Sequence, residues 1–114
     1  MAGANGPASV RGPSPQAYSA SMHVGVLQVR LHVPQANSLK EKRQVVRSIL
    51  DRARSRYHVA AAEIEEQDIH RIAVLGFASV SGSHHHAEEI VQKILDGLRL
   101  HPAARLIEHE LEVL

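Results

Sequence analysis

Two apolar periodicities alternate along residues 23–114, and their order limits the folds that this chain can adopt. Residues 23–33 place apolar side chains at every second position, which is typical of a strand with one buried face. Residues 38–57 then repeat at helical spacing, with an apolar stripe that runs from Leu39 to Tyr57. The same reasoning predicts strands at 58–65, 71–80 and 105–114, and a helix with an apolar stripe from Ala87 to Leu98.

The resulting order of strand, helix, strand, strand, helix and strand predicts an α+β fold of the ferredoxin-like split βαβ type, βαββαβ. Right-handed crossovers give a four-stranded antiparallel sheet of order 4-1-3-2 with both helices on one face. Residues 71–80 are apolar on both faces, as expected of a central strand. We therefore expect one ferredoxin-like domain at residues 22–114.

The starts of both helices carry local signals. Ser38 and Glu41 have the S-x-x-E spacing of a capping box, in which each side chain accepts from the other residue's backbone N–H. Ser83 follows Gly82 and is a suitable N-cap for the second helix. These residues set the expected boundaries of the helices.

The first 21 residues consist mainly of Gly, Ala, Pro and Ser, with Arg11 as their only charge. Such a composition does not supply a core. We predict a disordered N-terminal extension at residues 1–21, and we hypothesise that Met22 is the native start. An intact mass that includes residues 2–21 would exclude this hypothesis.

The first helix is strongly basic. Residues 38–57 contain seven lysine and arginine side chains and two acidic ones, although the whole chain has a formal net charge of only +1. We expect these charges, Lys42 among them, to form a solvated positive face. The side chains spaced to follow phosphates, and so to bind nucleic acid, are Lys40, Arg43, Arg47 and Arg54. The alternative is that they serve solubility, with local pairs to Asp51.

The sheet face away from the helices suggests an interface. Val24 and Val26 would lie on it, and Glu108 or Glu110 of the last strand would meet Arg30 across it. In that last strand Ile107, Leu111 and Val113 alternate with the glutamates. A partly apolar exposed face usually marks an interface, so we predict a homo-oligomer, with a dimer favoured.

No residue set indicates catalysis, a cofactor or a small-molecule substrate. Glu63 and Glu65 are expected to share one strand face and, with Glu66 and Asp68, to form a solvated edge and turn. Successive histidines at 84–86 point about 100° apart on a helix, whereas chelation favours i and i+4 positions. We therefore predict neither a catalytic nor a metal site.

Several short runs resemble a known family. They are Met22 to Leu27, Ser38-Leu39-Lys40-Glu41-Lys42-Arg43, Val45-Val46-Arg47, Ala62-Glu63, Gln67-Asp68 and Glu110-Leu111-Glu112. The chain resembles the YlxP-like family of small bacterial proteins of unknown function over residues 22–114. The resemblance implies a ferredoxin-like fold and a cytoplasmic bacterial protein, often encoded among genes for translation initiation and ribosome maturation. It implies no catalytic residues.

We rank three functions by how well the sequence supports them. The first is a non-enzymatic accessory factor that binds a ribosomal particle or RNA backbone through the helix at 38–57. The second is a homo-oligomeric structural or regulatory module that uses the open sheet face, and an enzyme is third. With one Phe and two Tyr, base stacking on the sheet is not expected. The chain lacks cysteine and any apolar run of about 20 residues, so we predict a cytoplasmic protein without a membrane span.

Overall fold

The computed structural model describes residues 21–114. Its elements are β1 (His23–His32), α2 (Leu39–Tyr57), β2 (Ala60–Glu65), β3 (Ile72–Ser81), α3 (His84–Arg99) and β4 (Arg105–Val113). The predicted N-terminal extension lies outside the described residues, apart from Ser21. The extension and the start at Met22 therefore stay predictions.

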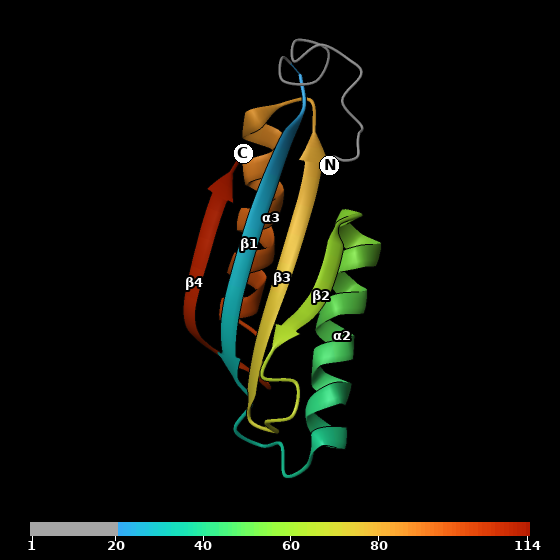
Figure 1. Cartoon of the computed structure of the whole chain (residues 1–114), viewed down its shortest axis with the longest axis vertical. Coiled ribbons are helices and arrows are strands. Elements are labelled where there is room, and N and C mark those ends of the chain that lie inside the picture. Colours follow the sequence, from blue (N-terminus) through green and yellow to red (C-terminus); the bar gives the residue numbers. More distant parts are fainter. Residues whose placement is uncertain (1–20) are drawn as a thin grey trace, which may run out of the picture.

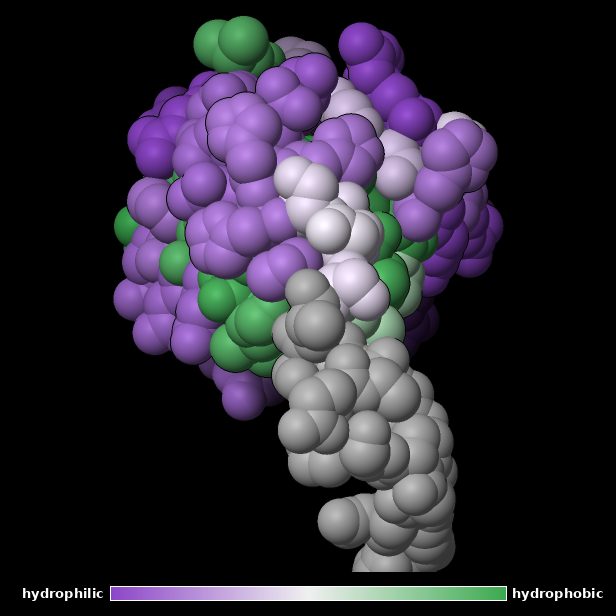
Figure 2. All heavy atoms as spheres, turned by 90° about the horizontal axis from the view of Figure 1, so that it is seen from above, coloured by the Kyte–Doolittle hydropathy of each residue, from purple (hydrophilic) through white to green (hydrophobic). Residues whose placement is uncertain are grey.

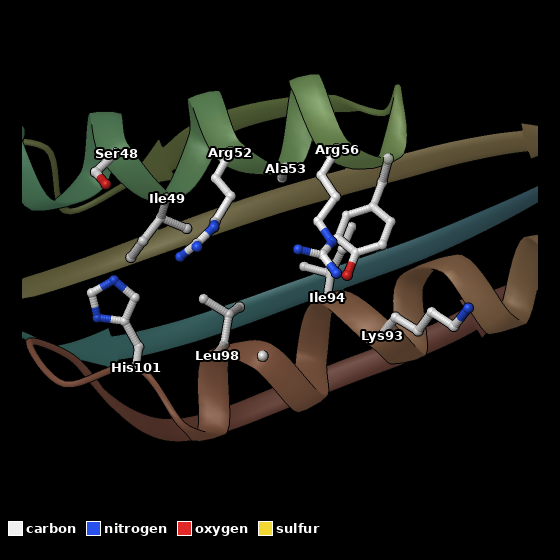
Figure 3. Close-up of a pocket in the computed structure, with 11 residues that line it drawn as sticks. Ser48, Ile49, Arg52, Ala53, Arg56, Lys93, Ile94, Leu98 and His101 are labelled. Carbon is white, nitrogen blue, oxygen red and sulfur yellow. The ribbon is translucent and has the colours of Figure 1, made fainter.

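The four strands form one sheet of order β2-β3-β1-β4, in which every neighbouring pair is antiparallel. Read from the other edge, this is the predicted order 4-1-3-2, so the ferredoxin-like fold is confirmed. Both helices lie on one face of the sheet (Figures 1 and 3), with α2 beside β2 and α3 over β1 and β4. The helices run antiparallel to one another, because each returns the chain along the strand before it.

The core lies between the sheet and the helices. Leu27, Val29 and Leu31 of β1 are buried on this face, and β3 contributes Leu75 and Phe77. Register pairs Leu27 with Phe77 and Val29 with Leu75, so the two central strands present a continuous apolar surface to the helices. The alternation along residues 23–33 predicted this face correctly.

Helix α3 approaches β1 closely at Gly25. A Cβ at this position would meet the backbone carbonyl oxygen of Ala87, in the first turn of α3. The hydroxyl of Ser79 donates to the same oxygen at 3.1 Å. The helix therefore packs directly on backbone here, and only glycine leaves it room.

A β-bulge in β2 changes the expected placement of the acidic residues. Glu63 pairs with Leu75 but Glu65 pairs with Val74, so Ile64 is the extra residue. One inserted residue exchanges the faces of the positions that follow it. Glu63 thus points towards the helices and Glu65 towards the open face, and the prediction that they share a face was wrong.

A second bulge lies in β4. Arg30 pairs with Glu108, but the next residue of β1, Leu31, pairs with Leu106. Leu106 therefore packs against the core, while Ile107 is half exposed. The simple alternation predicted for residues 105–114 fails at this one position because, as in β2, the strand holds one inserted residue.

The helix caps are close to those predicted. The hydroxyl of Ser38 accepts from the Glu41 N–H at 3.1 Å, and that of Ser83 accepts from the His86 N–H at 3.2 Å. The carboxylate of Glu41, however, accepts from the N–H of Asn37 at 2.6 Å rather than from that of Ser38. The capping box thus closes one residue earlier than its usual form.

Candidate nucleic-acid interface and neighbouring sites

Three of the four predicted phosphate-binding residues share an open flank of α2. Lys40, Arg43 and Arg47 are exposed. Within residues 21–114, none of them has a carboxylate oxygen within 4.0 Å. Lys40 and Arg47 are seven residues apart, which is about 10 Å along a helix axis. This flank therefore presents three free positive charges to solvent.

The fourth residue, Arg54, has bonds of its own. Its guanidinium donates to the carbonyl of Ala61 in β2 at 2.6 Å and to the carboxylate of Asp51 at 3.1 Å. The bond to Ala61 joins the last turns of α2 to the edge strand β2. The structure gives Arg54 this structural role, and a contact between Arg54 and RNA stays a prediction.

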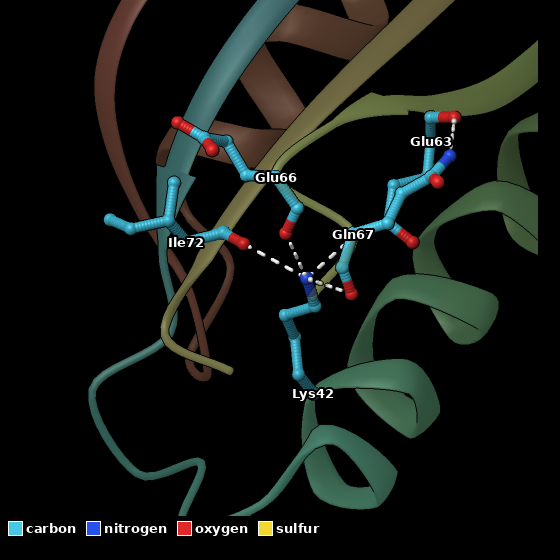
Figure 4. Close-up of polar contacts among 5 residues, drawn as sticks. All are labelled: Lys42, Glu63, Glu66, Gln67 and Ile72. Atoms are coloured by element: carbon cyan, nitrogen blue, oxygen red, sulfur yellow. Dashed lines mark hydrogen bonds and ion pairs between the residues drawn. The ribbon is translucent and has the colours of Figure 1, made fainter. Parts of the chain in front are cut away.

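Lys42 does not belong to the solvated face that the sequence predicted. Its side chain is 0% exposed, and Figure 4 shows it reaching from α2 towards the loop that joins β2 to β3. The ammonium group donates to the carbonyls of Glu66 at 2.8 Å, Ile72 at 3.0 Å and Gln67 at 3.4 Å. The expectation of a solvated Lys42 was wrong.

Glu63 supplies the countercharge. Its Oε2 lies 2.9 Å from the Lys42 Nζ, yet the two atoms are not aligned as a hydrogen bond. An ammonium group has three N–H donors, and here the three backbone carbonyls receive them. The carboxylate therefore contributes charge rather than a hydrogen bond, and Glu63 is not part of a solvated edge.

The position of Lys42 in the helix contains a signal for this burial. Lys42 comes three residues after Leu39 and four before Val46, and both of these belong to the apolar stripe. At 100° per residue it must point inwards with them. A lone lysine inside an apolar stripe therefore predicts a buried acceptor for its ammonium group. A count of charges does not reveal this.

The predicted interface residues lie on the open sheet face. Val24 and Val26 are half-buried there, and Glu108 and Glu110 are exposed. Arg30 is opposite Glu108 in register, as expected, but its guanidinium bonds to the Glu66 carboxylate at 2.9 Å. The bulge at Ile64 shifts the end of β2, and Glu66 follows it, so the ion pair forms with that acid instead of with β4.

The remainder of that face is apolar. A shallow depression crosses three strands and is lined by Val26, Ala60, Ala62, Ile64 and Ala78, among others. Ile64 is 47% exposed and lies over Gly76, where a Cβ would meet its side chain. Val80, further along β3, is 67% exposed. The open face is thus apolar along β2 and β3 and acidic along β4.

The histidines at 84–86 occupy the start of α3 and are exposed. His84 packs edge-on against His23, with 5.6 Å between ring centroids, and His86 Nδ1 lies 3.7 Å from Glu89. Figure 2 shows that hydrophilic residues cover most of this end of the molecule, with smaller apolar areas between them. Residues 21–114 contain no group of three or more His, Asp or Glu side chains arranged to hold a metal ion.

Sequence reasoning missed a basic groove between α2 and α3, which has a volume of about 260 Å³. Figure 3 shows Arg52 and Arg56 extending from α2 towards α3, with His101 near the end of α3. Lys93 lines the α3 side. Arg52 and Arg56 are one turn apart and just outside the apolar stripe, and this spacing could have indicated a basic flank directed at the neighbouring helix.

His101 stays neutral more readily than an ordinary histidine. Burial lowers its pKa below the usual 6.5, and the positive charge of Arg52 lowers it further. Its Nδ1 accepts from the N–H of Ala103 at 3.1 Å, which requires that nitrogen to be unprotonated. In this tautomer, assigned from the hydrogen bond, Nε2 carries the proton.

Comparison with known proteins places these features in a family context. Residues 24–111 match the family model described as "Protein of unknown function (DUF503)". The chain is also 35% identical to the "Uncharacterized protein YlxP" of Bacillus subtilis (strain 168) over 72 residues, which are 63% of this chain and 78% of that protein. No helix within residues 21–114 is long and apolar enough to cross a bilayer.

Proposed function

Because this chain belongs to the DUF503 family of proteins of unknown function, whose name assigns no chemistry, we propose a function from its surface. The protein is a non-enzymatic, cytoplasmic accessory factor that binds the RNA backbone of a ribosomal particle through α2. The flank formed by Lys40, Arg43 and Arg47 makes the contact. The observation that carries this proposal is that all three cations are exposed and free of carboxylate partners within residues 21–114.

The length and direction of this flank suit phosphates. Its three charges extend over about 10 Å of helix, a distance over which a nucleic-acid duplex presents several phosphates. No aromatic side chain of residues 21–114 is exposed on the sheet, since Phe77 is buried in the core. These features favour contacts with phosphates and shape over stacking on bases.

The test is co-sedimentation of the full chain with ribosomal subunits across a salt series. Arg43→Glu combined with Arg47→Glu removes two free charges from the flank. Arg99→Glu combined with Arg105→Glu makes the same change in net charge at exposed positions elsewhere. We expect the first variant to bind more weakly and to reduce the steepness of the salt dependence by about two, one for each lost phosphate contact.

The control variant should bind almost as the wild type does. If the wild type does not co-sediment at low salt, the proposal is wrong. Equal loss in both variants would show that net charge, and not this flank, governs binding.

A second candidate function is a homodimer formed through the open sheet face. The apolar depression over Ala60, Ala62 and Ile64 supports it, because an exposed apolar area of this kind usually marks an interface. We expect light scattering to detect a dimer of the full chain at micromolar concentration. Ala62→Lys should give a monomer, whereas Gln44→Lys, which adds the same charge on α2, should not. A wild type that is only monomeric would exclude this function.

A further inference from the structure

The groove between α2 and α3 concentrates positive charge around an empty space. Arg52 and Arg56 reach into it from α2, and Lys93 and His101 line it from the other side (Figure 3). Its lining within residues 21–114 includes no acidic residue. The groove therefore has the electrostatic character of an anion site.

The cations of the groove differ from the ion-paired cations of this protein. Arg30, Lys42 and Arg54 each pair with a carboxylate. Within residues 21–114, Arg52, Arg56 and Lys93 have no carboxylate oxygen within 4.0 Å. Two like charges one helical turn apart repel each other. A bound anion would relieve this repulsion.

The shape of the arginine side chains favours phosphate among the anions. A guanidinium presents paired N–H donors that match phosphate oxygens, and two such groups can grip one phosphate from adjacent turns. The Cζ of Arg56 lies 5.6 Å from the Tyr57 ring centroid, so a cation–π contact helps to hold that guanidinium in place. Nε2–H of the neutral His101 is a further donor.

The floor of the groove is apolar. Ile49, Ala53, Ile94 and Leu98 line it, and all four are buried in the core. A ligand that fills the groove therefore needs an apolar or aromatic part beside its phosphate. The volume of about 260 Å³ is below the range of drug-sized sites, about 300 to 1,000 Å³. The ligand is accordingly small, of the size of a single nucleotide.

We propose that this groove binds a mononucleotide, with the phosphate held by Arg52 and Arg56 and the nucleoside over the apolar floor. Two sources share this chemistry: a free nucleotide, and the phosphorylated end of an RNA strand. The proposal goes beyond the RNA-backbone contact proposed above, because it uses the other flank of α2. Arg43 and Arg52 are nine residues apart, which is about 180° around the helix.

The first experiment titrates the full chain with AMP, adenosine and inorganic phosphate, followed by NMR. We expect AMP to bind at least about tenfold more tightly than either of the other two, because it alone engages both the cations and the floor. The shift changes should centre on residues that line the groove. If AMP binds no more tightly than adenosine or phosphate, a free nucleotide is excluded as the ligand.

The second arm distinguishes the two sources. A short oligouridylate with a 5′-phosphate is compared with the same oligomer bearing a 5′-hydroxyl. Preference for the phosphorylated oligomer, without tight AMP binding, would assign the site to RNA ends, and AMP binding without that preference would assign it to free nucleotides. If neither AMP nor the phosphorylated end is preferred, the proposal is wrong.

Matched variants separate this site from the proposed RNA interface. Arg52→Gln with Arg56→Gln should weaken mononucleotide binding at least tenfold, whereas Arg43→Gln with Arg47→Gln should leave it unchanged. All four side chains are exposed, and thermal melting checks that each variant folds. Equal effects of the two variants on AMP binding would overturn the assignment to this groove, whatever the result with ribosomal subunits.

Discussion

Two sites on α2 place positive charge in opposite surroundings. Near its start, Lys42 is fully buried and surrounded by one carboxylate and three backbone carbonyls. Near its end, Arg52 and Arg56 extend into a groove without a carboxylate within 4.0 Å in the described chain. In the charge count all three are simply basic helix residues. Their roles differ because the β2–β3 segment supplies acceptors to Lys42, whereas Arg52 and Arg56 have no carboxylate partner within residues 21–114.

The largest expected effect on stability comes from removing the buried, hydrogen-bonded cation of Lys42. Lys42→Met leaves the Glu63 carboxylate without its countercharge and three carbonyls without their donor. We expect the free energy of unfolding, measured by urea denaturation, to fall by about 3 to 5 kcal/mol, as for other broken buried ion pairs. Lys40→Met, at an exposed position two residues away, should change it by less than about 0.5 kcal/mol. Similar losses in the two variants would contradict the structural role of Lys42.

Arg54 lies between Arg52 and Arg56 in the sequence but has bonded acceptors, so its removal should have an intermediate effect. Arg54→Ala removes the bond to the Ala61 carbonyl and an exposed ion pair with Asp51. The expected loss in unfolding free energy is about 1 kcal/mol, most of it from the hydrogen bond. Binding to ribosomal subunits should persist. Unchanged stability with impaired binding would instead restore Arg54 to the phosphate-binding set.

Removing an unpaired cation should change the unfolding free energy in the opposite direction. Arg52→Gln relieves the repulsion between Arg52 and Arg56, so the unfolding free energy should rise by about 0.2 to 0.5 kcal/mol at low salt. The gain should disappear at about 1 M salt, where such repulsion is screened. A destabilised Arg52→Gln protein would mean that Arg52, like Lys42, stabilises the fold.

The smallest effect is a shift in the titration of His101. Because Arg52 is one cause of its lowered pKa, Arg52→Gln should raise that pKa, while burial keeps it below 6.5. An NMR titration of the imidazole resonances measures this. Arg99 and Arg105 line the adjoining hollow with His101. A wild-type pKa of 6.5 or above would contradict the description of this site.

The lowered pKa also sets the sign of a pH effect on stability. The folded chain binds the His101 proton less tightly than the unfolded chain does. The contribution of His101 to stability is therefore fully present above its pKa of about 6.5 in the unfolded chain. This contribution is lost as the pH falls through its pKa in the folded chain.

The regular parts of the fold were predictable because their apolar residues recur with the period of a strand or of a helix. Leu27, Val29 and Leu31 alternate, and Val46, Ile49 and Ala53 recur at helical spacing, so their buried faces could be assigned from sequence. The two bulges could not be assigned in this way. Neither Ile64 nor Ile107 is a glycine or another residue that marks a bulge, and the extra residue is set by how two strands meet.

The candidate sites were less predictable for the same reason. The exposed flank of Lys40, Arg43 and Arg47 follows from spacing along one helix. The groove depends on how far apart α2 and α3 lie on the sheet, which no local pattern specifies. The ion pair of Arg30 depends on the bulge in β2, since without it Glu66 would not be expected to lie beside that arginine.

The Lys42 cluster also has a consequence for the order of folding. Its hydrogen bonds join residues 24, 25 and 30 positions apart in the chain. The ammonium group loses its water only when α2, β2 and the β2–β3 loop have already met, because any earlier burial would leave a charge without acceptors. We therefore expect these contacts to form after the rate-limiting step, so that they slow unfolding and leave the folding rate almost unchanged. The cluster then governs how long the native state persists, rather than how quickly it is reached.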